Sequence, residues 1–331
     1  MKHGKCILLY SGGLDSLLAG KILMDLGVEV TGLHFILPYF LPDIEPEMLK
    51  ESVIAKQIGL KIIHYRCGEE YIDMLKNPPH GYGKHINPCI DCKIFFIKKA
   101  IELMAETGAD FIATGEVVGQ RPMSQLKHTL NHIENSTLKG KLLRPLSAKL
   151  LKPTIAEING IIDREKLYDI NGRGRSRQIE LARKFGIKEY TSPAGGCLFT
   201  DKFIALRIRD LIVNSPAFKQ DDLYLLKTGR HFRLNTSVKI IVSRNERESI
   251  ELEKYESLFT YSFKPLFKGP SAFVKGKINN DDINIINSII CRYGKPVEEE
   301  NHIEIFSNGA LLFKITSVEP INDNILEKMR I

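Results

Sequence analysis

Three cysteines have the spacing that metal or sulfur chemistry needs. Cys89 and Cys92 stand three residues apart in the stretch HINPCIDCK, and Cys197 follows a Gly-Gly turn in SPAGGCLFTD. The first two fall at the start of a predicted helix, whose N-terminus lowers thiol pKa values. Of the six cysteines, the remaining Cys6, Cys67 and Cys291 are expected to be buried. Six cysteines in a chain of this length do not form a disulfide framework, so clustered ones favour metal or catalytic roles.

A glycine-rich turn follows the first predicted strand and reads Ser11-Gly12-Gly13-Leu14-Asp15-Ser16. Two glycines let the backbone turn tightly and approach a ligand closely. The serines and Asp15 open the next helix, whose free amide groups and dipole favour phosphate. The turn lacks the lysine of a P-loop and the third glycine of a dinucleotide fingerprint. The sequence therefore predicts a phosphate site that belongs to neither of those two classes.

This hexapeptide resembles the loop SGGxDS of the PP-loop ATP pyrophosphatases, which cleave ATP between its α and β phosphates and adenylylate a substrate. The resemblance spans about residues 5 to 200. It implies pyrophosphate contacts by the loop, with Mg²⁺ bridging the phosphates, and it makes Asp15 a catalytic candidate. The implied ATP-binding residues of the loop are Ser11, Gly12, Gly13, Leu14, Asp15 and Ser16. His34 and Phe35, which end the second predicted strand, are candidates for an adenosine wall, although His34 is equally well read as a core histidine.

A second motif leaves the fourth predicted strand at Thr114-Gly115-Glu116 and continues through Gln120 to Ser124-Gln125. With Arg144-Pro145-Leu146 and Lys152, it is similar to the series TGE-x-x-GQ…SQ…RPL…K of the tRNA 4-thiouridine synthetases. Such polar side chains at a strand end can bind ATP or position a base. The resemblance implies ATP contacts by Thr114, Gly115 and Gln120, and it narrows the substrate to a tRNA uridine.

The cysteine pattern resembles that of the iron–sulfur-dependent tRNA thiolation enzymes, in which three thiolates hold a [4Fe–4S] cluster. Four cysteines would complete the usual ligand set, so three leave one iron open. The resemblance implies that Cys89, Cys92 and Cys197 are both cluster ligands and catalytic residues. Three other interpretations stay open: a persulfide on Cys197 that Cys89 resolves without metal, zinc bound by the cysteines and a histidine such as His85, or structural sulfurs. The context NPCxxC also resembles the tRNA 2-thiouridylases.

Short apolar runs alternate with helical patterns through the first 160 residues, as is typical of parallel strands covered on both faces. The predicted strands are Cys6–Tyr10, Val28–Phe35, Lys61–Tyr65, Ala109–Thr114 and Lys141–Leu146, and the predicted helices are Asp15–Leu26, Glu47–Ile58 and Cys92–Glu106. This alternation predicts an α/β domain with a doubly wound, mostly parallel sheet. The resemblance implies an adenine nucleotide alpha hydrolase-like fold, whose ligand lies at the carboxyl ends of the strands.

The pattern changes beyond about residue 220, where a small α+β domain is expected. Its predicted elements are the strand Val238–Val242, the helices Glu246–Phe259 and Asp281–Tyr293, and the strands Ile303–Phe306 and Ala310–Ile315, joined through the hairpin signal Asn308-Gly309. The tail resembles the RNA-binding domain of NFACT proteins. The expected domains are a catalytic domain at 1–170, a basic segment at 171–222 packed on it, and an RNA-binding domain at 223–331.

Basic residues concentrate in residues 171–234, which hold thirteen Lys or Arg and six acidic residues. The resulting net charge of +7 equals that of the whole chain. A basic segment beside a candidate active site indicates a polyanionic substrate, although a solvated charged surface is the alternative. The expected RNA-binding residues are Arg173, Arg175, Arg177, Lys227, Arg230, Arg233 and Arg244.

With the resemblances, the sequence predicts an ATP-dependent tRNA sulfurtransferase that makes 4-thiouridine, with ATP, Mg²⁺ and a [4Fe–4S] cluster as cofactors. The alternatives are 2-thiouridine synthesis at the anticodon wobble position, a PP-loop protein that adenylylates small molecules, and an RNA-binding module with a vestigial nucleotide site. The chain starts almost at the glycine loop and has no rhodanese domain, so tRNA docking is expected from the basic segment and tail, and sulfur from sulfide or a separate donor protein. No apolar run reaches the ~20 residues that cross a bilayer, which favours a cytoplasmic protein without membrane contact. A homodimer is left open.

Overall fold

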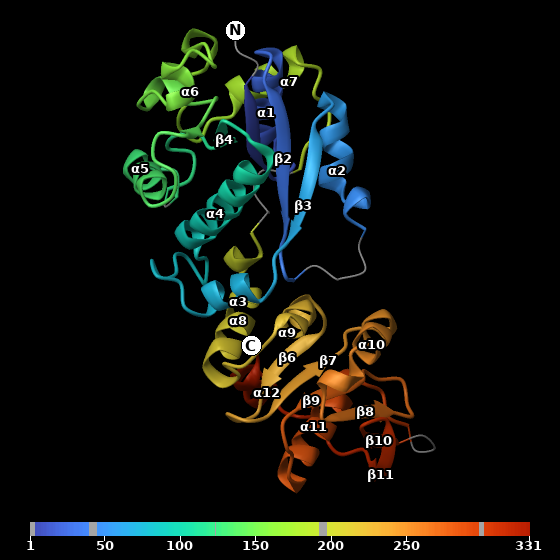
Figure 1. Cartoon of the computed structure of the whole chain (residues 1–331). Helices are drawn as coiled ribbons and strands as arrows, with labels where there is room; N and C mark the ends of the chain where they lie inside the picture. Colours follow the sequence, from blue (N-terminus) through green and yellow to red (C-terminus); the bar gives the residue numbers. More distant parts are fainter. Residues whose placement is uncertain (1–3, 40–44, 123, 192–196, 298–300) are drawn as a thin grey trace. The chain divides into compact units, whose positions relative to one another are not determined.

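The computed structural model describes residues 4–39, 45–122, 124–191, 197–297 and 301–331. The chain forms two compact units, Met1–Leu198 and Phe199–Ile331 (Figure 1). The expected basic segment, 171–222, is therefore divided between them, since its first helix packs on the first helix of the chain. No helix within the described ranges has the length and apolar character needed to cross a membrane.

The first unit is built on a five-stranded parallel sheet with the strand order β3-β2-β1-β4-β5. The strands are β1 Lys5–Tyr10, β2 Glu29–Ile36, β3 Lys61–Arg66, β4 Phe111–Thr114 and β5 Leu142–Leu143. The strand order reverses between β1 and β4, and open α/β sheets bind their ligands at such a point, outside the carboxyl ends of the strands. The prediction of a doubly wound parallel sheet is confirmed.

Helices cover both faces of this sheet (Figure 1). Leu8 of β1 packs in a core with α1 (Leu14–Asp25), α2 (Lys50–Ala55) and α7 (Ser176–Lys184). The neighbouring Ile7 lies in a second core with α4 (Cys89–Thr107) and α5 (Lys127–Asn135), because successive strand residues point to opposite faces. The other helical segments of the unit are η1 Pro46–Met48, η2 Lys56–Ile58, α3 Glu69–Lys76, η3 Ala148–Leu150, α6 Ile155–Ile158 and η4 Arg164–Lys166.

The second unit contains a six-stranded sheet with the order β11-β10-β8-β9-β7-β6, in which every pair is antiparallel. Its strands are β6 Arg230–Arg233, β7 Lys239–Val242, β8 Tyr261–Pro265, β9 Ala272–Lys275, β10 His302–Ser307 and β11 Ala310–Thr316. Its helices are η5 Leu198–Thr200, α8 Lys202–Asn214, α9 Gln220–Tyr224, η6 Leu225–Lys227, α10 Glu246–Glu253, η7 Glu256–Leu258, α11 Asn280–Tyr293 and α12 Asp323–Met329. The expected α+β architecture is confirmed.

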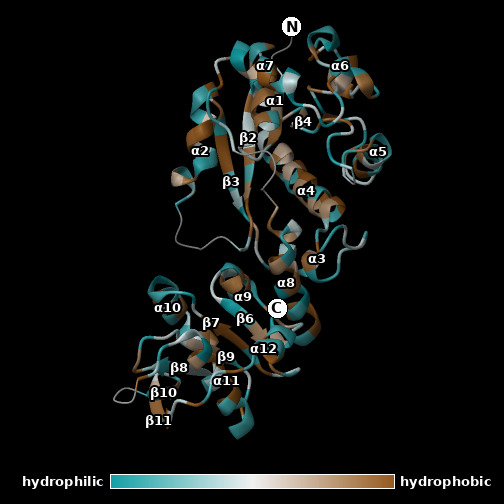
Figure 2. Cartoon of the chain, turned by 180° about the vertical axis from the view of Figure 1, so that it is seen from behind, coloured by the Kyte–Doolittle hydropathy of each residue, from teal (hydrophilic) through white to brown (hydrophobic). Residues whose placement is uncertain are grey.

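The core of the second unit lies where the sheet meets α11. Figure 2 shows apolar residues along β7 and β9, whereas α10 is mostly polar. The predicted hairpin joins β10 to β11, and Asn308 and Gly309 at its turn both adopt positive φ angles, of 50° and 75°. These are the backbone angles that an Asn-Gly hairpin turn requires.

Candidate active site

The glycine-rich loop lies where β1 ends and α1 begins. Gly13 is the N-cap of α1, and the Ser16 hydroxyl donates a hydrogen bond of 2.8 Å to its carbonyl oxygen. Gly12 adopts a left-handed φ of +72°, which favours glycine. The amide of Thr191 donates to the Gly12 carbonyl at 3.0 Å and fixes the other side of the loop. Hydrogen bonds from Ser16 and Thr191 thus fix the loop at the carboxyl edge of the sheet.

The end of β4 approaches this loop as closely as backbone atoms allow. A Cβ atom on Gly115 would lie 2.5 Å from both the Asp15 carbonyl carbon and the Ser16 nitrogen. Thr114 ends β4 and is buried, and the Gln120 amide donates a hydrogen bond of 3.0 Å to Asp15 Oδ2. The structure therefore brings the two sequence motifs together at the switch point between β1 and β4.

Asp15 is the central charged group of the loop. Its second oxygen, Oδ1, is buried and has no hydrogen-bond partner among the described residues. Burial raises the pKa of this carboxyl, while Gln120, Arg175 and Arg121 offset part of the rise. A partly compensated buried carboxylate with a vacant oxygen suits a divalent cation, because hard cations such as Mg²⁺ prefer oxygen ligands.

His34 and Phe35 do not contribute their side chains to one common wall. His34 is buried against Tyr10, and its Nδ1 lies 3.2 Å from Nδ1 of His64. Burial lowers the pKa of His34 to about 4, and His64 contributes to the lowering. Phe35 stacks on Phe96 of α4 with ring centres 4.3 Å apart. The two side chains leave opposite faces of the sheet because they are consecutive in β2.

A buried charge network lies beside the β4 motif and was not anticipated from the sequence. Glu116 pairs with Lys93 of α4, and its Oε2 accepts a bond of 3.1 Å from Nε of Arg144. Arg144 is 1% exposed and also donates to Glu134 at 2.8 Å. Burial alone would raise the pKa of Glu116, but Lys93 and Arg144 outweigh it and lower the pKa to about 2.

The first turn of α4 carries both clustered cysteines. Cys89 is its first residue, Cys92 lies one turn further on, and the Tyr71 hydroxyl is 3.1 Å from the Cys92 sulfur. Burial raises the pKa of the Cys92 thiol, the Tyr71 hydrogen bond opposes this, and charge interactions with Cys197 and Cys89 raise it further. Cys92 thus lies within electrostatic reach of both other thiols. The expectation that the helix terminus lowers thiol pKa values is wrong for Cys92, because burial outweighs it.

The donor set fits an iron–sulfur cluster in ligand type, because such clusters are held by cysteine thiolates. Cys197 is half-buried, and the Gly195-Gly196 turn expected before it lies outside the described residues. Within the described part of the chain, no three His, Cys, Asp or Glu side chains are grouped closely enough to hold one metal ion. A multi-iron cluster spaces its thiolates more widely than a single ion does. The other three cysteines are buried, as expected.

Asp91, between the two cysteines, ties the start of α4 to the preceding loop. Its Oδ2 accepts a hydrogen bond of 3.1 Å from the backbone amide of His80, and its Oδ1 lies 2.7 Å from the His80 ring nitrogen Nδ1. His80 Nε2 in turn lies 2.9 Å from His132 Nε2 of α5. Asp91 is only 4% exposed, so this contact orders the chain that leads into Cys89.

The basic residues expected to bind RNA have different environments. In the first unit, Arg173 is exposed, and so is Arg177, whose guanidinium lies 2.7 Å from Asp169. Arg175 instead interacts with Asp15 and is half-buried. The sequence could not indicate this placement, because about 160 residues separate the two.

In the second unit, Lys227 is exposed and Arg230 lies over the ring of Tyr293 at 4.3 Å. Arg233 makes two hydrogen bonds of 2.7 Å to Asp210 and is 13% exposed, so it contributes mainly to packing. Arg244 pairs with Glu248 and is about half exposed.

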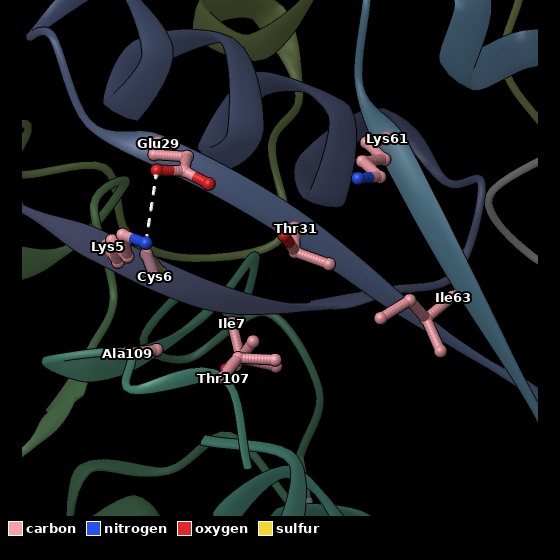
Figure 3. Close-up of a pocket in the computed structure, with 9 residues that line it drawn as sticks. All are labelled: Lys5, Cys6, Ile7, Glu29, Thr31, Lys61, Ile63, Thr107 and Ala109. Atoms are coloured by element: carbon pink, nitrogen blue, oxygen red, sulfur yellow. Dashed lines mark ion pairs between the residues drawn. The ribbon is translucent and has the colours of Figure 1, made fainter. Parts of the chain in front are cut away.

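The opposite, amino-terminal edge of the sheet carries a shallow pocket (Figure 3). It is lined by strand starts, including Lys5, Glu29 and Lys61, and the first two form an ion pair of 3.6 Å. Both partners of this pair are more than half exposed. The pocket lies at the opposite end of the strands from the glycine loop.

Comparison with known families agrees with this arrangement. Residues 1–167, half of the chain, match the sequence model of the ThiI family, described as thiamine biosynthesis protein. The chain belongs to the ThiI family. Residues 229–330 match the NFACT protein RNA binding domain, so the expected resemblance of the tail is confirmed.

Curated relatives of the ThiI part carry the name probable tRNA sulfurtransferase. The protein from Alkaliphilus metalliredigens is 31% identical over 153 residues, which are 44% of this chain and 36% of the relative. The protein from Staphylococcus aureus strain MRSA252 is 30% identical over 148 residues, 43% of this chain and 34% of the relative. The chain thus matches about a third of the length of these relatives.

Two solved structures are also similar to this chain. A 4-thiouridine synthetase–RNA complex with bound ATP is 21% identical, with a TM-score of 0.37, and the match covers 67% of this chain and 53% of that one. The U34-tRNA thiolase NcsA from Methanococcus maripaludis, with its [4Fe-4S] cluster, is 16% identical, with a TM-score of 0.32 and coverage of 67% and 69%.

Proposed function

We propose that this protein is an ATP-dependent tRNA sulfurtransferase that adenylylates a uridine carbonyl and replaces its oxygen with sulfur. The observation that carries the proposal is the meeting of three features in one ThiI-family unit: the glycine loop, the β4 motif beside it, and the Cys92 thiol with two other thiols within electrostatic reach. The glycine loop and the β4 motif suit a nucleoside triphosphate, and the thiols suit sulfur transfer.

In the first step, the uridine oxygen attacks the α phosphate of ATP and pyrophosphate leaves. The amide groups at the start of α1 bind the departing phosphates, because a helix N-terminus favours anions. Asp15, with Oδ1 unpartnered among the described residues, would hold the Mg²⁺ that accompanies them. Adenylylation converts a poor leaving oxygen into AMP.

In the second step, sulfide attacks the activated carbon of the uridine, and AMP leaves with the former carbonyl oxygen. Cys89, Cys92 and Cys197 would hold a [4Fe–4S] cluster, which would supply an iron without a protein ligand for binding sulfide. The half-buried setting of these thiols limits access of water, and the Asp91–His80 contact keeps the start of α4 in place. Sulfide or a separate donor protein provides the sulfur.

The tRNA is bound by basic residues of the first unit and by the second unit, which contains the NFACT-like part. Exposed Arg173, Arg177 and Lys227 are the candidates for phosphate contacts. 4-Thiouridine is the favoured product because the β4 motif resembles that of the 4-thiouridine synthetases.

The experiment uses full-length protein purified without oxygen, unmodified tRNA, Mg-ATP and sulfide, followed by mass spectrometry of the digested tRNA. We expect 4-thiouridine that depends on ATP and disappears in the Cys197→Ala variant, with ATP binding retained. Cys291→Ala, which alters a buried cysteine of α11 in the other unit, is the matched control and should keep activity.

A 2-thiouridine product would move the modification to the anticodon. If a protein that binds ATP and contains iron produces no thionucleoside in the tRNA, the proposed substrate is refuted. Thiolation by Cys197→Ala at the normal rate would refute the role of that cysteine.

A further inference from the structure

A cluster of unpartnered polar atoms lies beside Asp15, where α7 packs on α1. Gln178 is 0% exposed, and neither its nitrogen nor its oxygen has a hydrogen-bond partner at normal distance and angle within the described part of the chain, although its amide lies close enough to the Asp15 carboxyl to lower the pKa of that group. Asp15 Oδ1 and Arg175 Nε are buried without partners in the same sense. Gln178 and Arg175 both interact with the Asp15 carboxylate, so the unpartnered atoms form one group, and the exposed Arg121 adds a charge interaction with the same carboxylate.

Such a group is costly in a folded protein unless something completes it. A buried polar atom without a partner costs about 1–3 kcal/mol, and native structures contain few of them. Here several occur together, next to a loop that already binds phosphate in the proposed reaction. A bound ligand is the explanation that accounts for all of them at once.

The chemistry of the cluster selects an anion. Arg175 and Arg121 bring two positive charges against the single negative charge of Asp15, and the Gln178 amide adds two further N–H donors. Arg175 is also the N-cap of α7, and its side chain makes no capping hydrogen bond to the amides of this nine-residue helix. Arginine, an amide and free helix amides are the groups that bind phosphate oxygens.

The neighbouring backbone fixes this arrangement to the nucleotide crevice. The amide of Gly172 donates to the Val118 carbonyl at 2.8 Å, just after β4, and α7 packs along α1. By contrast, Arg177 on the same helix is exposed and pairs with Asp169. The two arginines therefore lie in different environments although only one residue separates them.

We propose that Arg175 and Gln178 of α7, with Arg121, bind the outer phosphates of ATP and the pyrophosphate product. The site takes a polyphosphate accompanied by a divalent cation, whose oxygen ligand is Asp15. This assignment rests on the proposed function, and it reassigns Arg175 from RNA binding to nucleotide binding. The basic segment is thereby divided into an inner part for the nucleotide and an outer part for RNA.

The test measures binding of Mg-ATP and of Mg-pyrophosphate to full-length protein by calorimetry, for wild type, Arg175→Ala and Gln178→Leu. Each variant should bind both ligands at least about tenfold more weakly, since a hydrogen bond to a charged group is lost. Gln178→Leu should unfold at the same or a higher temperature without ligand, because a buried unpartnered amide is removed. Arg183→Ala, an exposed arginine of the same helix, is the matched control and should bind both ligands as wild type does.

The outcomes separate this proposal from the proposed function. If wild type binds ATP and pyrophosphate but both variants bind them equally tightly, the phosphate role of α7 is refuted and the proposed function stands. If Arg175→Ala weakens tRNA binding alone, the residue belongs to the RNA surface and the proposal is wrong. If wild type binds neither ATP nor pyrophosphate, both proposals fail together.

Discussion

Gly115 determines how closely the end of β4 can approach the nucleotide loop. A Cβ atom at this position would overlap backbone atoms of Asp15 and Ser16, which cannot move without displacing the start of α1. Gly115→Ala should therefore lower the free energy of unfolding by about 1–3 kcal/mol, the usual cost of overpacking, and weaken ATP binding. Urea unfolding and calorimetry measure both effects.

Gly174→Ala provides the matched control for this prediction. A Cβ atom on Gly174 meets nothing within 4 Å among the described residues, and its backbone does not require glycine. This variant should keep the stability of the wild type. Equal stability and ATP affinity for Gly115→Ala would show that the two motifs do not pack as described.

Glu116 makes the stability of the first unit depend on pH. Its pKa falls from 4.5 to about 2 on folding, since Lys93 and Arg144 outweigh the effect of burial. A depressed carboxylate pKa contributes stability above the unfolded value, and this contribution is lost as the pH falls from about 4.5 towards 2. At ~1.36 kcal/mol per pKa unit, the contribution is about 3 kcal/mol.

Glu116→Gln removes this titration. The variant should be less stable than wild type at pH 7, because buried Arg144 keeps only Glu134 as a charged partner and Lys93 loses its ion pair. Its free energy of unfolding should then change less between pH 6 and pH 3 than that of wild type, as measured by urea unfolding. Parallel curves for the two proteins would contradict the pairing.

At the scale of elements, the start of α4 depends on the contact between Asp91 and His80. The carboxylate of Asp91 accepts from the His80 amide and faces its ring nitrogen, which fixes the loop that delivers Cys89. Asp91→Asn should weaken this contact. Because both cysteine ligands flank residue 91, we expect less iron per protein after reconstitution and faster loss of iron to a chelator.

Glu102→Gln is the control for this experiment, because it lies on the same helix with a side chain that is 59% exposed. It should retain the iron content of wild type. If Asp91→Asn also retains it, with the same rate of loss, the loop contact does not position the cysteines.

The sequence predicted many of the elements with strong apolar patterns, although the apolar-rich helix α8 was missed. All five strands of the first sheet were predicted, because parallel strands buried on both faces give continuous apolar runs. The predicted helix Glu47–Ile58 is instead divided into η1, α2 and η2, since Pro46 starts one turn and extended Leu49 interrupts the helix. The strands β6, β8 and β9 were missed because they are short and bordered by charged residues, Pro or Gly.

The candidate site was predicted where its residues are neighbours along the chain. The loop of residues 11–16 and the pair Cys89 and Cys92 each form a local motif with a recognisable spacing. The position of Arg175 and Gln178 beside Asp15 depends on the packing of α7 on α1, which no local pattern encodes. The same holds for Glu116, whose partners Lys93 and Arg144 come from other elements.

At the scale of the whole molecule, the basic segment is shared by both units. Of the thirteen Lys or Arg residues in 171–234, six precede residue 199 and seven follow it. Each unit has a hydrophobic core of its own, so each is expected to fold alone. Neither unit then carries the full positive charge that attracts a polyanion, and tight tRNA binding needs both in one chain.

Residues 1–198 and 199–331, prepared separately, should each bind tRNA at least about tenfold more weakly than the full chain. Joining two weak sites makes the second binding event intramolecular and raises overall affinity by 10² or more in favourable cases. The full chain should also show the steeper fall of affinity with salt, because it neutralises more phosphates. Filter binding at several salt concentrations measures both quantities. If residues 199–331 alone bind tRNA with the affinity and salt dependence of the full chain, tRNA docking belongs to the NFACT-like part. The basic residues of the first unit would then act only in nucleotide binding.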